Sequence, residues 1–152
     1  MLRENFIERI FVYDRWQRMI EKGLSVSALM EFHQRHKFIL LAHEEVEYRK
    51  LGPLIASVSK QNLHDIANEY LQRMMTMLKA RSSRKRHTNV LMHVMGYLKN
   101  KIGGDDKQEM IEVMDNYRLG KVPLIVPVTL MKHHLRKYPD EYIDKQYYMM
   151  PY

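Results

Sequence analysis

The sequence contains no cysteine. A chain without cysteine cannot form disulfides, thiolate metal sites or a cysteine nucleophile, and it cannot by itself hold an iron–sulfur cluster. No apolar run approaches the roughly 20 residues that a membrane-spanning helix needs. The first residues, MLRENFIERIF, carry acids and have a helical pattern, unlike a signal peptide. We therefore expect a cytoplasmic protein that binds no membrane, no metal and no cofactor.

Acidic residues are missing from one long stretch, because none lies between Glu69 and Asp105. Residues 51–104 hold nine Lys or Arg against two Asp or Glu, whereas the segments on either side are nearly neutral. Most of the net charge of +7 therefore comes from the middle of the chain. Such an asymmetry favours a surface that faces a polyanion over a general role in solubility.

Apolar residues recur at helical spacing along most of the chain, and the only β-branched cluster, VPLIVPV, contains two prolines. Of the 152 residues, 45% are hydrophobic and 28% charged, which is typical of a globular chain. We predict an all-α fold of about six to eight helices in a single domain, residues 1–152. The expected helices cover residues 5–23; 25–51, which can break near Glu44 and ends at Gly52–Pro53; 54–58; 62–80; 88–102, capped by Thr88; 105–119; a segment after Pro127; and a short one after Pro139.

Three histidines lie in the stretch FHQRHKFILLAH. His36 and His43 share the helical spacing of Phe32, so they fall on the apolar face, which His33 flanks. Seven residues of helix rise about 10.5 Å, so His36 and His43 cannot easily share one metal. We interpret both as buried and hydrogen-bonded, with metal binding and a catalytic or ligand-contacting role as the alternatives.

The segment KARSSRKRHTNVLMHVMGYLKNK carries the clearest functional pattern. Its basic residues 84–86 directly precede the predicted helix start at Thr88, where free N–H groups and the helix dipole attract anions. Asn89, His93 and Tyr97 recur at every fourth residue as a polar-aromatic stripe that could contact a base or ribose. The predicted nucleic-acid-binding residues are Arg81, Arg84, Lys85, Arg86, His87, Asn89, His93, Tyr97 and Lys99.

A plainer interpretation of the same segment is an exposed loop followed by an ordinary amphipathic helix whose stripe packs on a neighbour. A second basic run, KHHLRK at residues 132–137, could extend the patch or form an exposed helix face of its own.

Several ordered blocks resemble the YbgA-like domain, a bacterial domain of unknown function. The blocks are FVYDRW, FHQRHKFILLAH, YRKLGPLIA, HTNVLMHVMGYLK, YRLGKVPLIVPVTLMKHH, YPDEY and the glutamine at 146. The resemblance covers nearly the full length. Many relatives have Ser–Pro where this chain has Glu44–Glu45, and relatives usually continue past the equivalent of the final Pro151–Tyr152.

The resemblance implies a domain that occurs alone or fused behind a cysteine-rich desulfidase domain. Such fused proteins use an iron–sulfur cluster to remove sulfur from thiolated uracil, including thiouridine in tRNA, and their helical domain is taken to hold the RNA. Stand-alone relatives are often encoded beside DNA photolyases, which leaves DNA open as a partner. No catalytic residues carry over from the family.

Residues and resemblance together lead us to expect a non-catalytic nucleic-acid-binding accessory domain, with tRNA or another RNA as its partner. A desulfidase or a photolyase is a further expected partner from the resemblance. Two alternatives stay open: an enzyme that uses His36, His43 or His93 as a general base, and a helical protein-interaction module.

Overall fold

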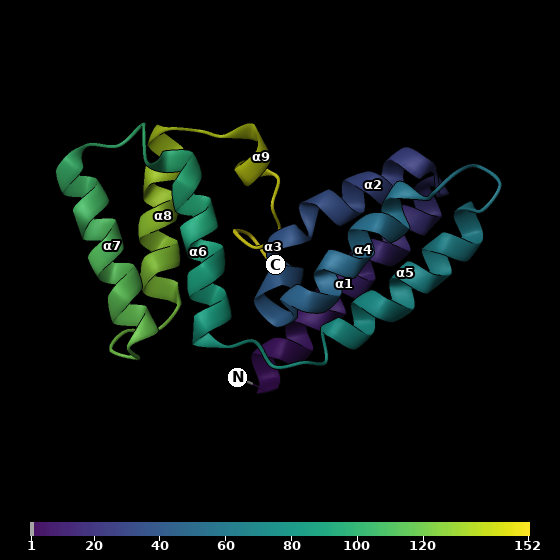
Figure 1. The fold of residues 1–152 in the computed structure, drawn as a ribbon, viewed down its shortest axis with the longest axis horizontal. Coiled ribbons are helices and arrows are strands. Elements are labelled where there is room, and N and C mark those ends of the chain that lie inside the picture. Colours follow the sequence, from purple (N-terminus) through teal and green to yellow (C-terminus); the bar gives the residue numbers. More distant parts are fainter. Residues whose placement is uncertain (1) are drawn as a thin grey trace.

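The structure is a computed structural model that describes residues 2–152 (Figure 1). These residues form nine α-helices and no strand, so the predicted all-α class is confirmed and the helix count lies just above the expected range. The helices are α1 (Leu2–Gly23), α2 (Val26–Arg35), α3 (Lys37–His43), α4 (Glu45–Ala56), α5 (Leu63–Met77), α6 (Arg84–Leu98), α7 (Gly104–Arg118), α8 (Ile125–Lys137) and α9 (Glu141–Asp144).

The count is higher because the long helix expected from residue 25 is divided at two places. Ser25 caps its start, accepting a hydrogen bond from the backbone N–H of Ala28 at 3.1 Å. The expected break at Glu44 is confirmed, since this residue has extended φ and ψ angles of −153° and 95°. A second break at His36 was not predicted. Three helices therefore stand where the sequence pattern suggested one.

The prediction that Gly52–Pro53 ends this helical region was wrong, because both residues lie inside α4. A proline in a helix removes one backbone hydrogen bond. Leu51 and Ile55 are buried on either side of Pro53, and the carbonyl of Pro53 still accepts from Ser57 N–H at 3.1 Å. Burial of these apolar side chains holds the turn in helical form.

The start of α6 also differs from the prediction. Ser83 is the cap, accepting from the N–H of Arg86 at 3.2 Å, so the helix begins at Arg84 and not at Thr88. It ends at Leu98 instead of Ile102. The basic residues 84–86 thus form the first helical turn instead of preceding it. The prediction took Thr88 as the cap, but the Ser83 cap starts the helix earlier, although cations at this end oppose the helix dipole.

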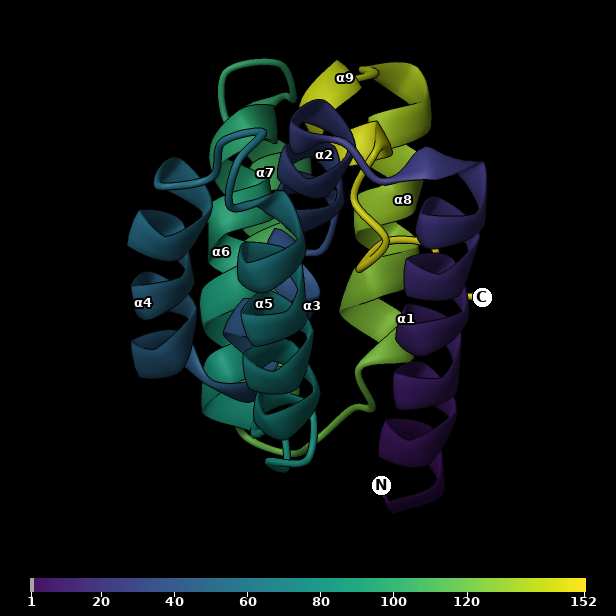
Figure 2. The same cartoon turned by 90° about the vertical axis from the view of Figure 1, so that its right-hand side faces the viewer.

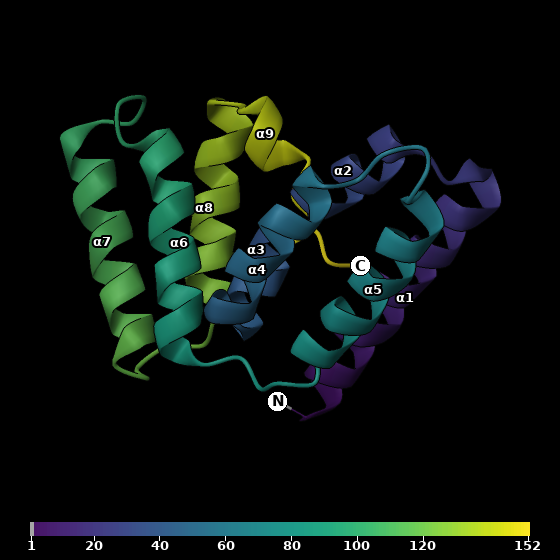
Figure 3. The ribbon, with the colours of Figure 1, turned by 45° about the vertical axis from the view of Figure 1, so that its right-hand side comes forward.

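Two helical groups meet at α3. On one side α6, α7 and α8 pack side by side, and on the other α4 packs against α5 (Figure 1). The helices α4 and α5 are also neighbours in the view of Figure 2. The short α3 contacts α4, α5 and α6, so it lies between the groups in both views (Figures 1 and 3). Phe38, Ile39 and Leu40 of α3 are buried in the core that the two groups share.

The first helix is anchored by Trp16. Its ring stacks on Tyr70 of α5 with centroids 5.8 Å apart and meets the edge of Phe32 of α2 at 5.2 Å. None of the helices within residues 2–152 is long and apolar enough to cross a bilayer.

The C-terminal segment closes the fold by binding at the break between α2 and α3. Gln146 is buried; its amide donates to the carbonyl of Gln34 at 2.7 Å, and its Oε1 accepts from Phe38 N–H at 3.4 Å. The ring of the next residue, Tyr147, is contacted by the guanidinium groups of Arg15 and Arg35, at 3.9 and 4.2 Å from its centre. The break between α2 and α3 leaves backbone groups without a helical hydrogen bond, and the side chain of Gln146, far along the chain, bonds two of them.

Candidate nucleic-acid interface

His36 is part of the core, as predicted. Its side chain is 0% exposed, its Nδ1 bonds the carbonyl of Phe32 at 2.7 Å, and its ring lies between Phe32 and Tyr147. Burial lowers the pKa of His36 to about 3, although the hydrogen bond to Phe32 acts in the opposite direction. The imidazole is therefore neutral at physiological pH and enclosed by aromatic rings.

His43 is also buried and hydrogen-bonded, as predicted. Its Nδ1 lies 2.6 Å from the carbonyl oxygen of Ala80, and its Nε2 contacts the carboxylate of Glu8. Burial works to lower the pKa of His43, but the hydrogen bonds to Glu8 and Ala80 outweigh it and raise the pKa above its ordinary value. Both ring nitrogens are occupied by the protein itself.

His33 flanks this pair and takes part in an aromatic cluster. Its Nδ1 lies 3.0 Å from the hydroxyl of Tyr70, and its ring stacks on Tyr48 at 5.4 Å. Burial lowers the pKa of His33 to about 4, with a smaller contribution from Lys37. The stretch of three histidines therefore serves mainly the packing of α2 and α3.

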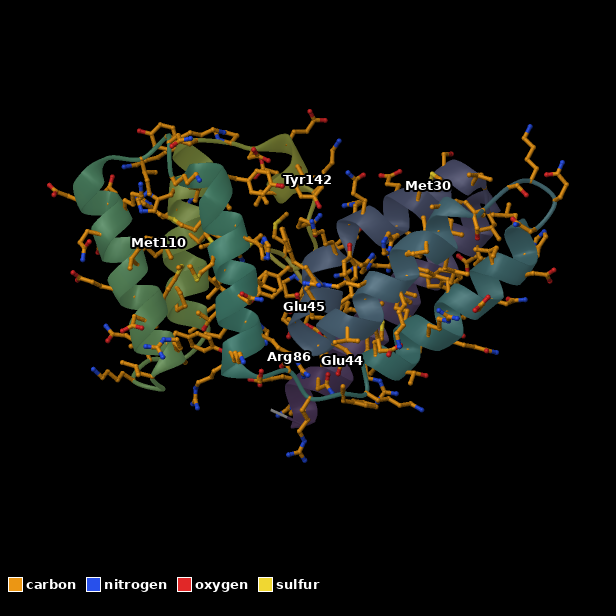
Figure 4. All side chains as sticks on the ribbon, in the orientation of Figure 1. Met30, Glu44, Glu45, Arg86, Met110 and Tyr142 are labelled. Carbon is orange, nitrogen blue, oxygen red and sulfur yellow. The ribbon has the colours of Figure 1, made fainter. Side chains whose placement is uncertain are left out.

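Three of the predicted binding residues have internal partners. Arg86 pairs with Glu44 at 3.3 Å and also donates to the carbonyl of Arg81 at 3.3 Å (Figure 4). His87 Nδ1 lies 2.8 Å from the hydroxyl of Tyr148, and burial lowers its pKa to about 4. The guanidinium of Arg84 lies against Gly120, where a Cβ atom would meet it at 3.4 Å. These side chains connect α6 to its neighbours, although Arg84 is still exposed.

Four further cations of the acid-free stretch point to solvent, whereas Arg73 and Lys101 are paired with carboxylates. Lys79 and Arg81 lie in the connection before α6, Lys85 lies in its first turn, and Lys99 follows its last residue; all four are exposed. Within residues 2–152, none of the four has a carboxylate partner among the ion pairs. Lys79 was not predicted as a binding residue, although it belongs to the same acid-free stretch. These four side chains define what we call the basic edge.

Asn89 and His93 extend along the solvent side of α6 between the two ends of the basic edge, and both are exposed. Met92, which lies between them in the sequence, is 60% exposed. Gly96, one turn further along, faces open space, because a Cβ atom added there would have no heavy atom within 4 Å. The alternative that this stripe packs on a neighbouring helix is therefore excluded for Asn89 and His93. Met92 was not predicted, because the stripe was defined by polar and aromatic side chains alone.

Tyr97 ends the stripe and is the member that makes a tertiary contact. Its ring stacks on Tyr142 of α9 with centroids 5.6 Å apart and planes 23° apart, and 39% of its surface stays exposed. Tyr142 was not predicted as part of the candidate interface, because α9 is 45 residues further along the chain and no periodicity connects them.

The second basic run does not form a uniform patch. His134 and Leu135 are buried in the core, whereas His133, Arg136 and Lys137 are exposed. The exposed side of α6 and the connection before it therefore remain the best candidate for an interface.

Comparison with known proteins identifies the family of this chain. The family described as "Protein of unknown function (DUF1722)" matches residues 37–152. "Uncharacterized protein YbgA" of Escherichia coli (strain K12) is 41% identical over 141 residues, which cover 92% of this chain and 83% of that protein. No solved structure matches the chain significantly. The extent of both matches, together with the all-α fold, means that this chain belongs to the DUF1722 family of YbgA-like proteins.

Proposed function

We propose that the chain is a non-catalytic domain that binds nucleic acid, with tRNA or another structured RNA as its ligand. The observation that carries this proposal is the basic edge: four exposed cations without carboxylate partners, drawn from the longest stretch of the sequence without acids. Lys85 and Lys99 are separated by about 21 Å of helix, at 1.5 Å per residue. A polyanion lying along α6 would be held at both ends by charge.

The groups between these cations suit contact with bases and sugars. Asn89 and His93 offer an amide and an imidazole, and Met92 and Tyr97 offer apolar and aromatic surface. Recognition of RNA commonly combines phosphate contacts with such neutral groups. Because the chain has no cysteine, iron–sulfur chemistry on a bound RNA would belong to a partner protein, such as the desulfidase domains that the family resemblance implies. A photolyase is the other partner that the resemblance suggests. Such a role goes with a cytoplasmic location.

The structure gives less support to a histidine-dependent enzyme. A general base needs a free nitrogen within reach of a substrate. The nitrogens of His43 are both engaged, His36 is enclosed by aromatic rings, and exposed His93 has no carboxylate partner within residues 2–152. None of the three therefore combines an orienting carboxylate with access to solvent.

The test is binding of fluorescein-labelled tRNA, followed by anisotropy at 50 and 200 mM salt. In the test variant Lys79, Arg81, Lys85 and Lys99 become glutamine. The control variant makes the same change at four cations outside α6 and outside the acid-free stretch: Lys22, Arg49, Lys50 and Lys60. Each lost phosphate contact should reduce the slope of log affinity against log salt by roughly 0.7–0.9. Absence of binding at low salt, or equal loss in both variants, contradicts the proposal.

A second candidate function, a helical protein-interaction module, is favoured by the exposed side of α1. Phe6, Ile10, Tyr13 and Ile20 are each at least 40% exposed, and their spacing places them along one face of the helix. An apolar helix face of this kind can pack against a helix of another protein. Sedimentation of the Ile10→Ser protein, beside the wild type and with a candidate partner, tests whether this face carries an interaction.

A further inference from the structure

A groove lies beside the candidate interface, between α2, the end of α6 and α9. Its volume is about 600 Å³, within the range typical of small-ligand sites. Tyr97 lines it and is also the last residue of the exposed stripe on α6, so the groove continues the candidate interface. In Figure 1 the short α9 lies between α6 and α2, and Figure 4 marks its Tyr142.

The groove offers an aromatic wall. Tyr97 and Tyr142 are stacked, and the exposed 39% of Tyr97 leaves surface for a further ring. Planar bases stack on such side chains in proteins that bind single-stranded nucleic acid. A tyrosine stacked on a second tyrosine is held in place, so a base would meet a preorganised surface.

Across from the tyrosines, α2 supplies two polar side chains that the protein uses little. Glu31 pairs with Arg35 only at 4.0 Å, the longest of the ion pairs, and its side chain is 66% exposed. Gln34 is exposed, and its side-chain amide makes no hydrogen bond within residues 2–152. Asp140 and Glu141 of α9 are already engaged by Ile143 N–H and by Lys145. The side chains of Glu31 and Gln34 are thus available for hydrogen bonds with a ligand.

Charge decides which part of a nucleotide enters. The groove is lined by three carboxylates against two cations, so it repels a phosphate that the basic edge attracts. A carboxylate accepts hydrogen bonds from the amino and imino groups of a base, and an amide can donate to a neighbouring carbonyl. Guanine presents this combination, with two N–H donors beside its O6 acceptor.

We propose that the groove binds an unpaired guanine base of an RNA whose backbone lies on the basic edge. This inference rests on the proposed function. Tyr97 supplies the stacking surface, Glu31 accepts from the two N–H groups, and Gln34 donates to O6.

The probes are fluorescein-labelled RNA heptamers, UUUNUUU, with G, A, C or U at the central position. Anisotropy at 50 mM salt should give at least about fivefold tighter binding for G than for U, the lower end of what one bidentate hydrogen-bonded contact to a base supplies. Glu31→Gln should remove most of this preference, and so should Tyr97→Ala. Tyr97→Phe keeps the ring and should retain the preference. The control Glu109→Gln makes the same charge change on exposed α7 and should leave the preference intact. Melting curves of each variant separate loss of folding from loss of recognition.

The outcomes distinguish the two proposals. If all heptamers bind equally well, or if the preference for G survives both Glu31→Gln and Tyr97→Ala, the groove does not bind guanine, although the basic edge can still bind RNA. If no heptamer and no tRNA binds the folded wild type at low salt, the proposed function fails and the guanine site fails with it.

Discussion

His43 of α3 and Glu8 of α1 are joined by a hydrogen bond from the imidazole Nε2 to the carboxylate. The other ring nitrogen of His43 faces the carbonyl of Ala80 at 2.6 Å. A carboxylate and a carbonyl only accept hydrogen bonds, so the doubly protonated imidazolium is the form that satisfies both. This arrangement agrees with the raised pKa of His43, in which the two hydrogen bonds overcome the effect of burial.

The raised pKa predicts that this contact stabilises the fold below the ordinary histidine pKa and loses its contribution as the pH rises through the folded-state pKa. Glu8→Gln should lower the free energy of unfolding by about 1–3 kcal/mol near pH 6 and by clearly less at pH 9. Urea denaturation at the two pH values measures the difference. Glu21→Gln, an exposed change on the same helix, is the control. An equal loss at pH 6 and pH 9 would argue against a charged His43.

Three other histidines should make the free energy of unfolding depend on pH in the opposite direction. The pKa values of His33, His36 and His87 are lowered to about 4, 3 and 4, mainly by burial. When the pH falls from 7 to 5, the unfolded chain takes up protons at these sites and the folded chain does not. Each histidine should then cost about 2 kcal/mol of stability at pH 5. Denaturant unfolding at pH 7, 6 and 5 measures the loss of unfolding free energy. His87→Gln should make this loss smaller. A free energy of unfolding that is constant across this range contradicts the lowered pKa values.

Gln146 should contribute to stability through its hydrogen bonds inside the protein. Replacing it by alanine leaves the carbonyl of Gln34 and the N–H of Phe38 without their partner in the core. We expect Gln146→Ala to lower the free energy of unfolding by about 1–3 kcal/mol. The exposed Gln72→Ala on α5 should change it by less than about 0.5 kcal/mol. Chemical denaturation of both variants checks the contrast, and similar values for the two would show that the tail does not hold the break together.

Arg86 and Lys85 are neighbours with different expected roles. Lys85 has no acidic partner within residues 2–152, so Lys85→Ala should weaken RNA binding and leave melting unchanged. Arg86 is paired with Glu44, so Arg86→Ala should cost up to about 1 kcal/mol of stability and affect binding less. Anisotropy and thermal melting on the two variants separate these effects. A larger binding loss for Arg86→Ala would mean that this ion pair opens when RNA binds.

Glu44→Ser tests the same ion pair from its acidic side. Serine is a better N-cap for α4 than glutamate, so the fold should not suffer. The change frees Arg86 for a phosphate and should strengthen RNA binding, with a salt slope steeper by up to about 0.9. Titration at two salt concentrations measures the slope. Glu45→Gln on the adjacent residue serves as the control and should leave the slope as it is.

Asn89 and His93 should affect selectivity without affecting stability. Because both are exposed, the double variant Asn89→Ala, His93→Ala should melt within a few degrees of the wild type. If these groups contact sugar or base, the variant should discriminate less between RNA and DNA of the same sequence, while its salt slope stays constant. Competition binding with matched RNA and DNA hairpins measures the discrimination. If the variant discriminates between RNA and DNA as well as the wild type does, Asn89 and His93 do not contact sugar or base, and only the charges of the basic edge bind the nucleic acid.

The sequence alone determined the features that depend on neighbours within about two helical turns. The all-α class follows from apolar residues at helical spacing. A serine cap before the long run was also expected, at Ser25 or Ser27, and the structure places it at Ser25. The burial of His36 and His43 follows from their share of that spacing. These are local properties, since a helix is built from contacts between residues three and four apart.

The tertiary structure decided what depends on residues far apart in the chain. The break at His36 is bridged by Gln146, whose partners lie 108 and 112 residues away, and no local pattern points to it. Arg86 and His87 had the same local signal as Lys85, but contacts with Glu44 and Tyr148, 42 and 61 residues away, leave them only half-exposed. Spacing along a helix states which face a side chain occupies. Which faces meet, and therefore which charges stay free for a ligand, is decided when distant helices pack.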